Sequence, residues 1–223
     1  MNPPMTVSAQ TDRFVHDRLP SPDAMPKLLF DAPELQFPHQ LNLVRELLDK
    51  APIKGFADLP MLRSDTETLT YTQARIRVDR IAHVLVQDLG LVPGNRVLLR
   101  GGNSIAMALA MLAVMKAGLI AVATMPLLRA KELGDIIDKS QPVVALCYVL
   151  LLNELQLAQV DHPVLQTLIA FNAPVGGGEP DSLEARSIDK HGPFAACPTA
   201  ATDIALLAFT SGTTGKPKAA VHT

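Results

Sequence analysis

The segment 210–218 of this 223-residue chain combines hydroxyl groups, glycines and lysines within nine positions. Its hydroxyls can donate hydrogen bonds, and its glycines allow sharp turns that bring backbone N–H groups close to a ligand. Successive inward-pointing N–H groups form an anion-binding concavity, and the lysines add positive charge. We therefore expect a polyphosphate site. Its candidate ligand residues are Thr210, Ser211, Gly212, Thr213, Thr214, Gly215, Lys216 and Lys218.

A Walker A loop has a similar composition but requires Gly-x-x-x-x-Gly-Lys followed by Ser or Thr. Here Thr210 stands at the first glycine position, and Pro217 follows Lys216. Both differences argue against a P-loop NTPase. A flexible Gly/Ser/Thr linker is the structural alternative. The apolar run 204–209 directly before the segment favours a ligand loop, because such loops follow strands in α/β proteins.

The elements that must position this loop follow an alternating pattern. Apolar runs predict strands at 96–100, 119–124, 143–147, within 164–171 and at 204–209. Helical periodicity predicts helices from Thr72 to just before Gly90, from Ser104 to Ala117, over 130–139 and over 150–159. This alternation indicates an α/β fold with a mostly parallel sheet flanked by helices. Ligands of such sheets bind beyond the carboxyl ends of the strands.

The remaining segments are less regular. Residues 1–40 carry seven prolines, which predict an extended surface arm whose first dozen residues are mobile. A short helix is expected over 41–50, and a hairpin is expected from strands at 61–63 and 69–71. Within the long connection 172–202, Asp181 and Glu184 predict a capping-box-like start to a short helix ending near Ser187.

Composition excludes several classes of function. The chain is 48% hydrophobic with a net charge of −2, which gives no electrostatic reason for binding nucleic acid or an anionic membrane. Cys147 and Cys197 lie far apart without a Cys-x-x-Cys motif, and the histidines lack metal-ligand spacing. We therefore expect neither a disulfide framework nor a metal site. Cys147, inside an apolar run, is expected to be a buried thiol.

The most hydrophobic stretch, 105–128, is interrupted by Lys116, Gly118 and Pro126. It is therefore expected to form a buried helix, a turn and a buried strand rather than a membrane span. The N-terminus lacks the pattern of a secretory signal peptide. These observations together predict a cytoplasmic protein.

Residues 209–218 resemble the phosphate-binding signature of the adenylate-forming superfamily. Its pattern is an aromatic residue followed by Thr-Ser-Gly-(Ser/Thr)-Thr-Gly-x-Pro-Lys-Gly. Ala219 replaces the usual final glycine, and the pattern leaves the Lys216 position open, which favours Lys218 as the functional lysine. Two upstream segments also resemble the family, Leu-Thr-Tyr-Thr at 69–72 and Met-Lys-Ala-Gly at 115–118 followed by Pro-Leu at 126–127.

The resemblance implies an acid-thiol ligase that uses ATP, Mg²⁺ and coenzyme A. A carboxylate attacks the α-phosphorus of ATP, pyrophosphate leaves, and a thiol then displaces AMP to give a thioester. Segments 28–31, 88–97 and 123–133 are most similar to those of benzoate and 2-aminobenzoate CoA ligases, which implies an aryl carboxylate substrate. Residues 41–223 would then be the first α/β part of the family's large N-terminal domain, after the arm at 1–40.

In this family the adenine- and ribose-binding motifs, the hinge and the mobile domain with the catalytic lysine follow the phosphate loop. We therefore expect no catalytic residue within these 223 residues and no ligase activity from them alone. His222 either faces the ligand or has a solvent-exposed or core-capping role. Two alternatives stay open, an adenylation domain that loads a carrier protein and a non-catalytic nucleotide-binding module.

Overall fold

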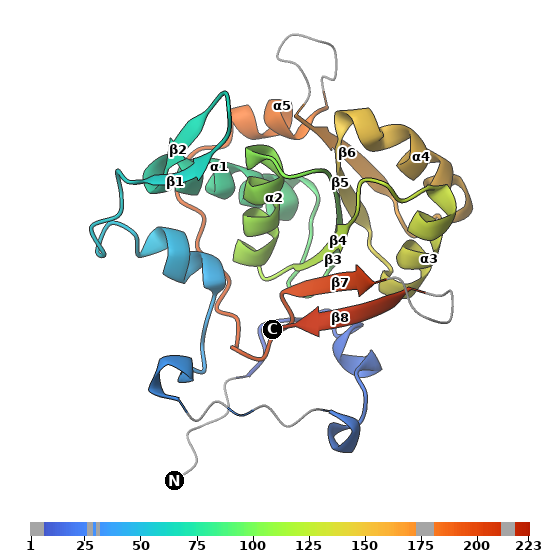
Figure 1. The fold of residues 1–223 in the computed structure, drawn as a ribbon, viewed down its shortest axis with the longest axis horizontal. Helices are drawn as coiled ribbons and strands as arrows, with labels where there is room; N and C mark the ends of the chain where they lie inside the picture. Colours follow the sequence, from blue (N-terminus) through green and yellow to red (C-terminus); the bar gives the residue numbers. More distant parts are fainter. Residues whose placement is uncertain (1–6, 26–28, 30–31, 173–180, 211–216) are drawn as a thin grey trace.

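The computed structural model describes residues 7–25, 29, 32–172, 181–210 and 217–223. A six-stranded sheet with the order β6-β5-β3-β4-β7-β8 forms the centre of the molecule (Figure 1). All neighbouring strands in it are parallel except the last pair, β7 and β8. The strands are β3 Arg96–Arg100, β4 Ile120–Thr124, β5 Val144–Tyr148, β6 Thr167–Phe171, β7 Leu206–Thr210 and β8 Lys218–His222. The predicted α/β class with a mostly parallel sheet is confirmed.

Helices cover both faces of the sheet. One buried cluster joins α1 and α2 to the face that carries Val97 and Leu99, and a second joins α3 and α4 to the face that carries Leu98. The helices are α1 Tyr71–His83, α2 Ile105–Lys116, α3 Ala130–Ser140, α4 Leu152–Asp161 and α5 Leu183–Ile188. Because both faces are covered, the middle residues of the central strands are apolar, as Val97, Leu98 and Leu99 of β3 are.

Capping residues set the helix ends that the sequence predicts. The Thr70 hydroxyl accepts a hydrogen bond from the Gln73 N–H, and the Gln73 side chain accepts one from the Thr70 N–H, which is a complete capping box for α1. Ser104 caps α2 by accepting from the Met107 N–H at 3.1 Å. Gly90 and Gly118 follow the two helical segments with φ of 64° and 73°, a conformation that favours glycine.

Shorter elements complete the fold. The predicted hairpin is present as β1 Pro60–Arg63 and β2 Thr68–Thr70. The other turns are η1 His16–Arg18, η2 Pro22–Ala24, η3 Pro33–Leu35 and η6 Val149–Leu151, which are 3-10 helical, and η4 Arg45–Asp49 and η5 Val84–Asp88, which are π-helical. The η4 turn lies within the helix predicted over 41–50, and η5 extends α1 toward Gly90.

The helix α5 begins one residue later than predicted. Its N-cap is Ser182, whose hydroxyl accepts from the Ala185 N–H at 3.2 Å, whereas Asp181 stands just outside the helix. Glu184 does not complete a capping box, because with Ser182 as N-cap the third helical position is Ala185. Its carboxylate instead accepts from the Asn172 N–H at 2.6 Å. Serine and aspartate are both favourable N-cap residues, and the observed start of the helix makes Ser182 rather than Asp181 the N-cap.

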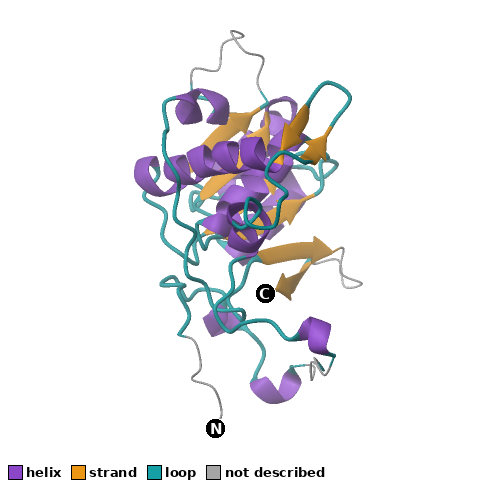
Figure 2. Cartoon of the chain, turned by 90° about the vertical axis from the view of Figure 1, so that its left-hand side faces the viewer, coloured by secondary structure: helices purple, strands orange, loops and turns teal. Residues whose placement is uncertain are grey.

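The N-terminal segment is more integrated than predicted. Gln10 is 4% exposed, and its amide group bonds both the N–H and the carbonyl of Ile204, at 3.2 and 2.7 Å. Val15 is also buried. The expectation of a mobile start is therefore wrong for residues 8–12, because Gln10 satisfies backbone groups of Ile204 as a strand partner would. The turns η1, η2 and η3 lie together on one side of the α/β body in both views (Figures 1 and 2).

Among the described residues, no helix is both long enough and apolar enough to cross a membrane.

Candidate functional site

The candidate site lies at the edge of the sheet where the parallel strands end. Thr210 is the last residue of β7, and β7 lies next to β4 in the sheet. After the segment 211–216, the chain returns as β8, antiparallel to β7, with Thr210 paired to Lys218. This is the type of position, beyond the carboxyl end of a strand, where α/β sheets bind ligands.

Two of the predicted phosphate-binding residues lie within the described part of the chain. Thr210 and Lys218 are both exposed, and the Thr210 hydroxyl donates to the Lys218 carbonyl at 3.5 Å. The other candidates, Ser211, Gly212, Thr213, Thr214, Gly215 and Lys216, lie outside the described residues. The β7–β8 ladder therefore brings the two ends of the predicted loop together.

The return strand β8 separates His222 from the loop. His222 pairs with Leu206 at the opposite end of the β7–β8 ladder and is exposed. Its carbonyl accepts from the Ala205 N–H at 2.9 Å. Of the two roles considered for His222, the solvent-exposed one fits this position.

A lysine that the sequence analysis did not single out contacts the end of the loop. Lys139, in the last turn of α3, donates from Nζ to the carbonyl of Pro217 at 3.0 Å. This contact places a third cation near the segment, in addition to Lys216 and Lys218 of the sequence. No local pattern indicates it, because Lys139 and Pro217 are 78 residues apart.

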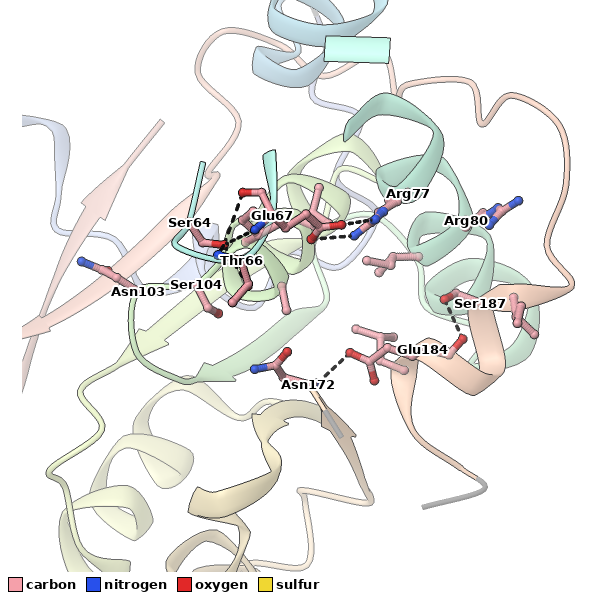
Figure 3. A pocket seen from close by; sticks show the side chains of 16 residues that line it. Ser64, Thr66, Glu67, Arg77, Arg80, Asn103, Ser104, Asn172, Glu184 and Ser187 are labelled. Atoms are coloured by element: carbon pink, nitrogen blue, oxygen red, sulfur yellow. Dashed lines mark hydrogen bonds and ion pairs between the residues drawn. The ribbon is translucent and has the colours of Figure 1, made fainter. Parts of the chain in front are cut away.

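A cavity of about 450 Å³ lies at another part of the same edge (Figure 3). Its lining includes apolar side chains of α1, α2 and α5, together with Ser104 at the start of α2 and Asn172 after β6. The ion pair between Arg77 and Glu67 lies at its border. Among the described residues, its lining includes none from β7 or β8.

The cysteines do not form a nucleophilic centre. Cys147 is fully buried, and burial raises the pKa of its thiol to about 12. Burial also raises the pKa of Cys197. Both thiols therefore stay protonated at neutral pH, where a thiol is a poor nucleophile. Among the described residues, no group of three or more His, Cys, Asp or Glu side chains is arranged to hold a metal ion.

The fold and the position of the loop agree with a comparison against protein families. The chain belongs to the AMP-binding enzyme family, whose model matches residues 50–223. The match includes the whole segment 210–218 and the two upstream segments that resemble the adenylate-forming enzymes.

Individual relatives are similar over most of this chain. Benzoate–CoA ligase of Thauera aromatica is 28% identical over 190 residues, which are 85% of this chain and 35% of that protein. A long-chain-fatty-acid–CoA ligase of Salmonella typhimurium is 26% identical and covers 86% of this chain and 38% of its own length. This chain thus spans about a third of the length of the curated relatives that it matches.

A solved structure has the same fold. The anthranilate CoA ligase AuaEII, in complex with anthranoyl-AMP, superposes with a TM-score of 0.75 and 23% sequence identity. The match covers 84% of this chain and 34% of that one. The sheet and helices described above are therefore the fold of one part of an adenylate-forming enzyme.

Proposed function

We propose that this chain is the first part of the N-terminal domain of an acid-thiol ligase, and that segment 210–218 binds the phosphates of ATP. The observation that carries the proposal is the placement of a family signature at the carboxyl end of β7. We further propose that residues 1–40 form an arm and that residues 41–223 form the α/β part. The whole protein would convert a carboxylic acid to its coenzyme A thioester.

The reaction has two steps. A carboxylate oxygen attacks the α-phosphorus of ATP, the bond from that phosphorus to the bridging oxygen breaks, and pyrophosphate leaves with the electron pair. The sulfur of coenzyme A then bonds to the acyl carbon, AMP leaves, and the thiol proton passes to solvent. Mg²⁺, which neutralises phosphate charge, enters this proposal bound to the ATP.

The loop would act by position and charge. Hydroxyl and N–H donors of residues 210–215, together with Lys216 and Lys218, would stabilise the negative charge that develops as pyrophosphate leaves. The pairing of Thr210 with Lys218 supports this role, because it fixes the two ends of the segment relative to each other. This role requires no general base from the loop.

An aromatic acid is the proposed substrate. Support comes from the relatives, which include a benzoate–CoA ligase, and from the structural match to an anthranilate CoA ligase. The similarity to a fatty-acid ligase means that the acid must be tested directly. We propose a cytoplasmic enzyme that acts on a free aryl carboxylate, without a nucleic-acid or membrane partner.

The test is ATP–pyrophosphate exchange by the full-length protein that contains these residues. Benzoate, 2-aminobenzoate, 3-hydroxybenzoate and a long-chain fatty acid would be supplied separately, and thioester formation would be followed after addition of coenzyme A. We expect exchange and thioester formation with at least one aryl acid. The same assay on residues 1–223 should give no acid-dependent exchange, and appreciable turnover there would refute the division of function proposed here.

The assay also separates the alternatives. Acid-dependent exchange without formation of a coenzyme A thioester would indicate an adenylation domain that loads a carrier protein. Binding of ATP without exchange for any acid would indicate a non-catalytic nucleotide-binding module. Either result would replace the ligase assignment.

A further inference from the structure

The two ends of the segment 211–216 receive different support from the sheet. Thr210 ends β7, a strand that pairs with β4 over 206–208 and with β8 over its whole length. Lys218 begins β8, which is the last strand of the sheet and pairs with β7 alone. Four of the five β8 residues are exposed. The return end of the segment, formed by Pro217 and Lys218, therefore belongs to an edge strand with one open side.

A lysine from α3 supplies a further contact at this return end. Lys139 donates from Nζ to the carbonyl of Pro217 at 3.0 Å. Among the described residues, no other residue outside 205–210 forms a hydrogen bond with 217–223. The carbonyl of Pro217 belongs to the planar peptide unit that leads into Lys218, the lysine that the family signature favours as functional. Holding this carbonyl therefore restrains the backbone from which the Lys218 side chain extends.

The end of α3 that carries Lys139 is itself fixed. Arg96, buried at the amino end of β3, donates to the carbonyls of Ser140 at 2.9 Å and Gln141 at 3.0 Å. Ser140 is buried as well, and Gln141 ends the helix in the left-handed conformation with a φ of 49°. The Lys139 side chain thus extends from a well-held backbone, so its ammonium can restrain the return end rather than follow its movement.

Lys139 also has a simpler role open to it. It is exposed in the last turn of α3, where a positive charge complements the negative end of the helix dipole. That effect would stabilise α3 alone. The hydrogen bond to Pro217 joins α3 to β8 across 78 positions of sequence. The two roles therefore differ in the element that would loosen if the lysine were lost.

We propose that Lys139 is a positioning residue for the proposed phosphate site. Its ammonium holds the Pro217 carbonyl and thereby fixes the backbone of Lys218, whose own ammonium then meets the phosphates from a set position. Lys139 acts through Pro217 and Lys218 and does not itself contact ATP. This inference rests on the proposed function of segment 210–218.

The same helix supplies a matched control. Lys131, in the first turn of α3, is exposed like Lys139. Its ammonium has no hydrogen-bond or ion-pair partner among the residues that the structure describes. Replacement of either lysine by methionine removes one positive charge from α3. Only the replacement of Lys139 removes a hydrogen bond to β8.

The experiment compares Lys139→Met, Lys139→Arg and Lys131→Met in the full-length protein. Hydrogen exchange without nucleotide would be measured for the amides of 218–222 and 137–141, and the dissociation constant for MgATP would be measured by calorimetric titration. For Lys139→Met we expect faster exchange over 218–222 and a dissociation constant raised about 3- to 10-fold, the size of one net hydrogen bond. Lys139→Arg keeps a cationic donor and should retain most of the affinity. Lys131→Met should change neither quantity.

A double variant tests whether Lys139 acts through Lys218. If it does, Lys139→Met combined with Lys218→Met should bind MgATP no more weakly than Lys218→Met alone. Additive losses of affinity would show that Lys139 acts independently of Lys218 and would overturn the proposal.

The amide measurements decide the remaining points. Unchanged exchange over 218–222 in Lys139→Met would overturn the positioning role, and faster exchange over 137–141 alone would assign Lys139 to the helix dipole instead. Faster exchange over 218–222 with the affinity of Lys131→Met would overturn the link to phosphate binding. A wild-type protein that does not bind MgATP would refute the proposed function, while the amide measurement would still show whether Lys139 holds β8.

Discussion

Lys116 of α2 donates a hydrogen bond from Nζ to the Asp79 carboxylate of α1 in the interior of the molecule. Lys116 is 0% exposed, and the Asp79 side chain is 3% exposed. A second carboxylate, that of Asp49 at the end of η4, lies 2.6 Å from the same Nζ. The lysine of the Met-Lys-Ala-Gly segment therefore joins three elements of the fold.

Removal of this lysine is expected to destabilise the fold strongly. Burial raises the pKa of Asp79, and the ammonium of Lys116 offsets part of that effect. Lys116→Met would leave the buried Asp79 with only the longer ion pair to Arg75, at 3.6 Å. Breaking a buried ion pair typically costs about 3–5 kcal/mol of the free energy of unfolding, and the remaining contact to Arg75 favours the lower end of this range. Urea unfolding of the variant measures the loss. Asp49→Asn is the matched control and should cost less, because Asp49 is 27% exposed.

A double variant separates the charge from the packing. If the cost arises from the loss of the Lys116 charge beside this buried carboxylate, Lys116→Met combined with Asp79→Leu should be more stable than Lys116→Met alone. Equal stability of the two variants would show that lost packing around the lysine stem explains the effect.

Gly118→Ala is expected to be more destabilising than Gly90→Ala. Both glycines have positive φ, so both substitutions incur the strain of a left-handed backbone, about 1–2 kcal/mol. A Cβ at Gly118 would also lie 2.6 Å from the sulfur of Cys197, whereas nothing lies within 4 Å of one at Gly90. Thermal unfolding of the two variants gives the loss of stability in each, and the difference between the two losses is the cost of the clash with Cys197.

The relief of this clash can be tested directly. Cys197→Ala removes the sulfur, so it should recover part of the stability lost in Gly118→Ala, although the Cys197 Cβ position at 2.9 Å remains occupied. An unchanged loss in the double variant would show that the Cys197 sulfur does not contribute to the cost.

Asp12 should stabilise the fold most at neutral pH. Burial alone would raise the pKa of its carboxyl group, but hydrogen bonds from the Phe14 N–H and from Arg96 outweigh burial and lower the pKa. The pKa of Asp12 is lower in the folded state than in the unfolded state, where it is about 3.9. Its contribution to stability is therefore complete at pH values above the unfolded pKa and is lost as the pH falls through the folded pKa. The difference in unfolding free energy between wild type and Asp12→Asn should therefore shrink as pH falls below about 4. A difference that stays constant down to pH 2 would contradict this assignment.

Cys147 should resist alkylation in the folded protein. Its pKa of about 12 leaves almost no thiolate at pH 8, and the side chain is fully buried. Cys197 is only partly buried, and burial raises its pKa as well, so it should react slowly but before Cys147. Mass spectrometry after iodoacetamide treatment, with and without urea, distinguishes the two sites. Rapid labelling of Cys147 without urea would show that the β5 region opens readily.

The regular elements could be predicted because their signals are local. Ala74, Val78 and Ile81 repeat with helical spacing and are all buried in α1. The apolar run 97–99 predicts the strand β3 without reference to any other segment. Ser104 is the N-cap of α2, the helix that the sequence predicts after this strand. The position of Thr210 at the end of a strand followed from the same local pattern.

The remaining features depend on residues that are distant in sequence. Lys116 finds its carboxylates 37 and 67 positions earlier, and Lys139 finds the Pro217 carbonyl 78 positions later. The strand β8 is mostly exposed and has only three apolar residues, and it forms where the chain returns along β7. The burial of Gln10 likewise depends on Ile204, 194 positions away.

The antiparallel pairing of Thr210 with Lys218 has a consequence for how this molecule can be altered. The two strands fix the distance between the ends of segment 211–216 through backbone hydrogen bonds, whichever side chains the segment carries. We therefore expect that exchange of these residues at constant length leaves the β7–β8 pairing unchanged. In this chain Thr210 and Lys218 belong both to the sheet and to the proposed phosphate-binding residues, whereas the other six candidates lie between them in the sequence.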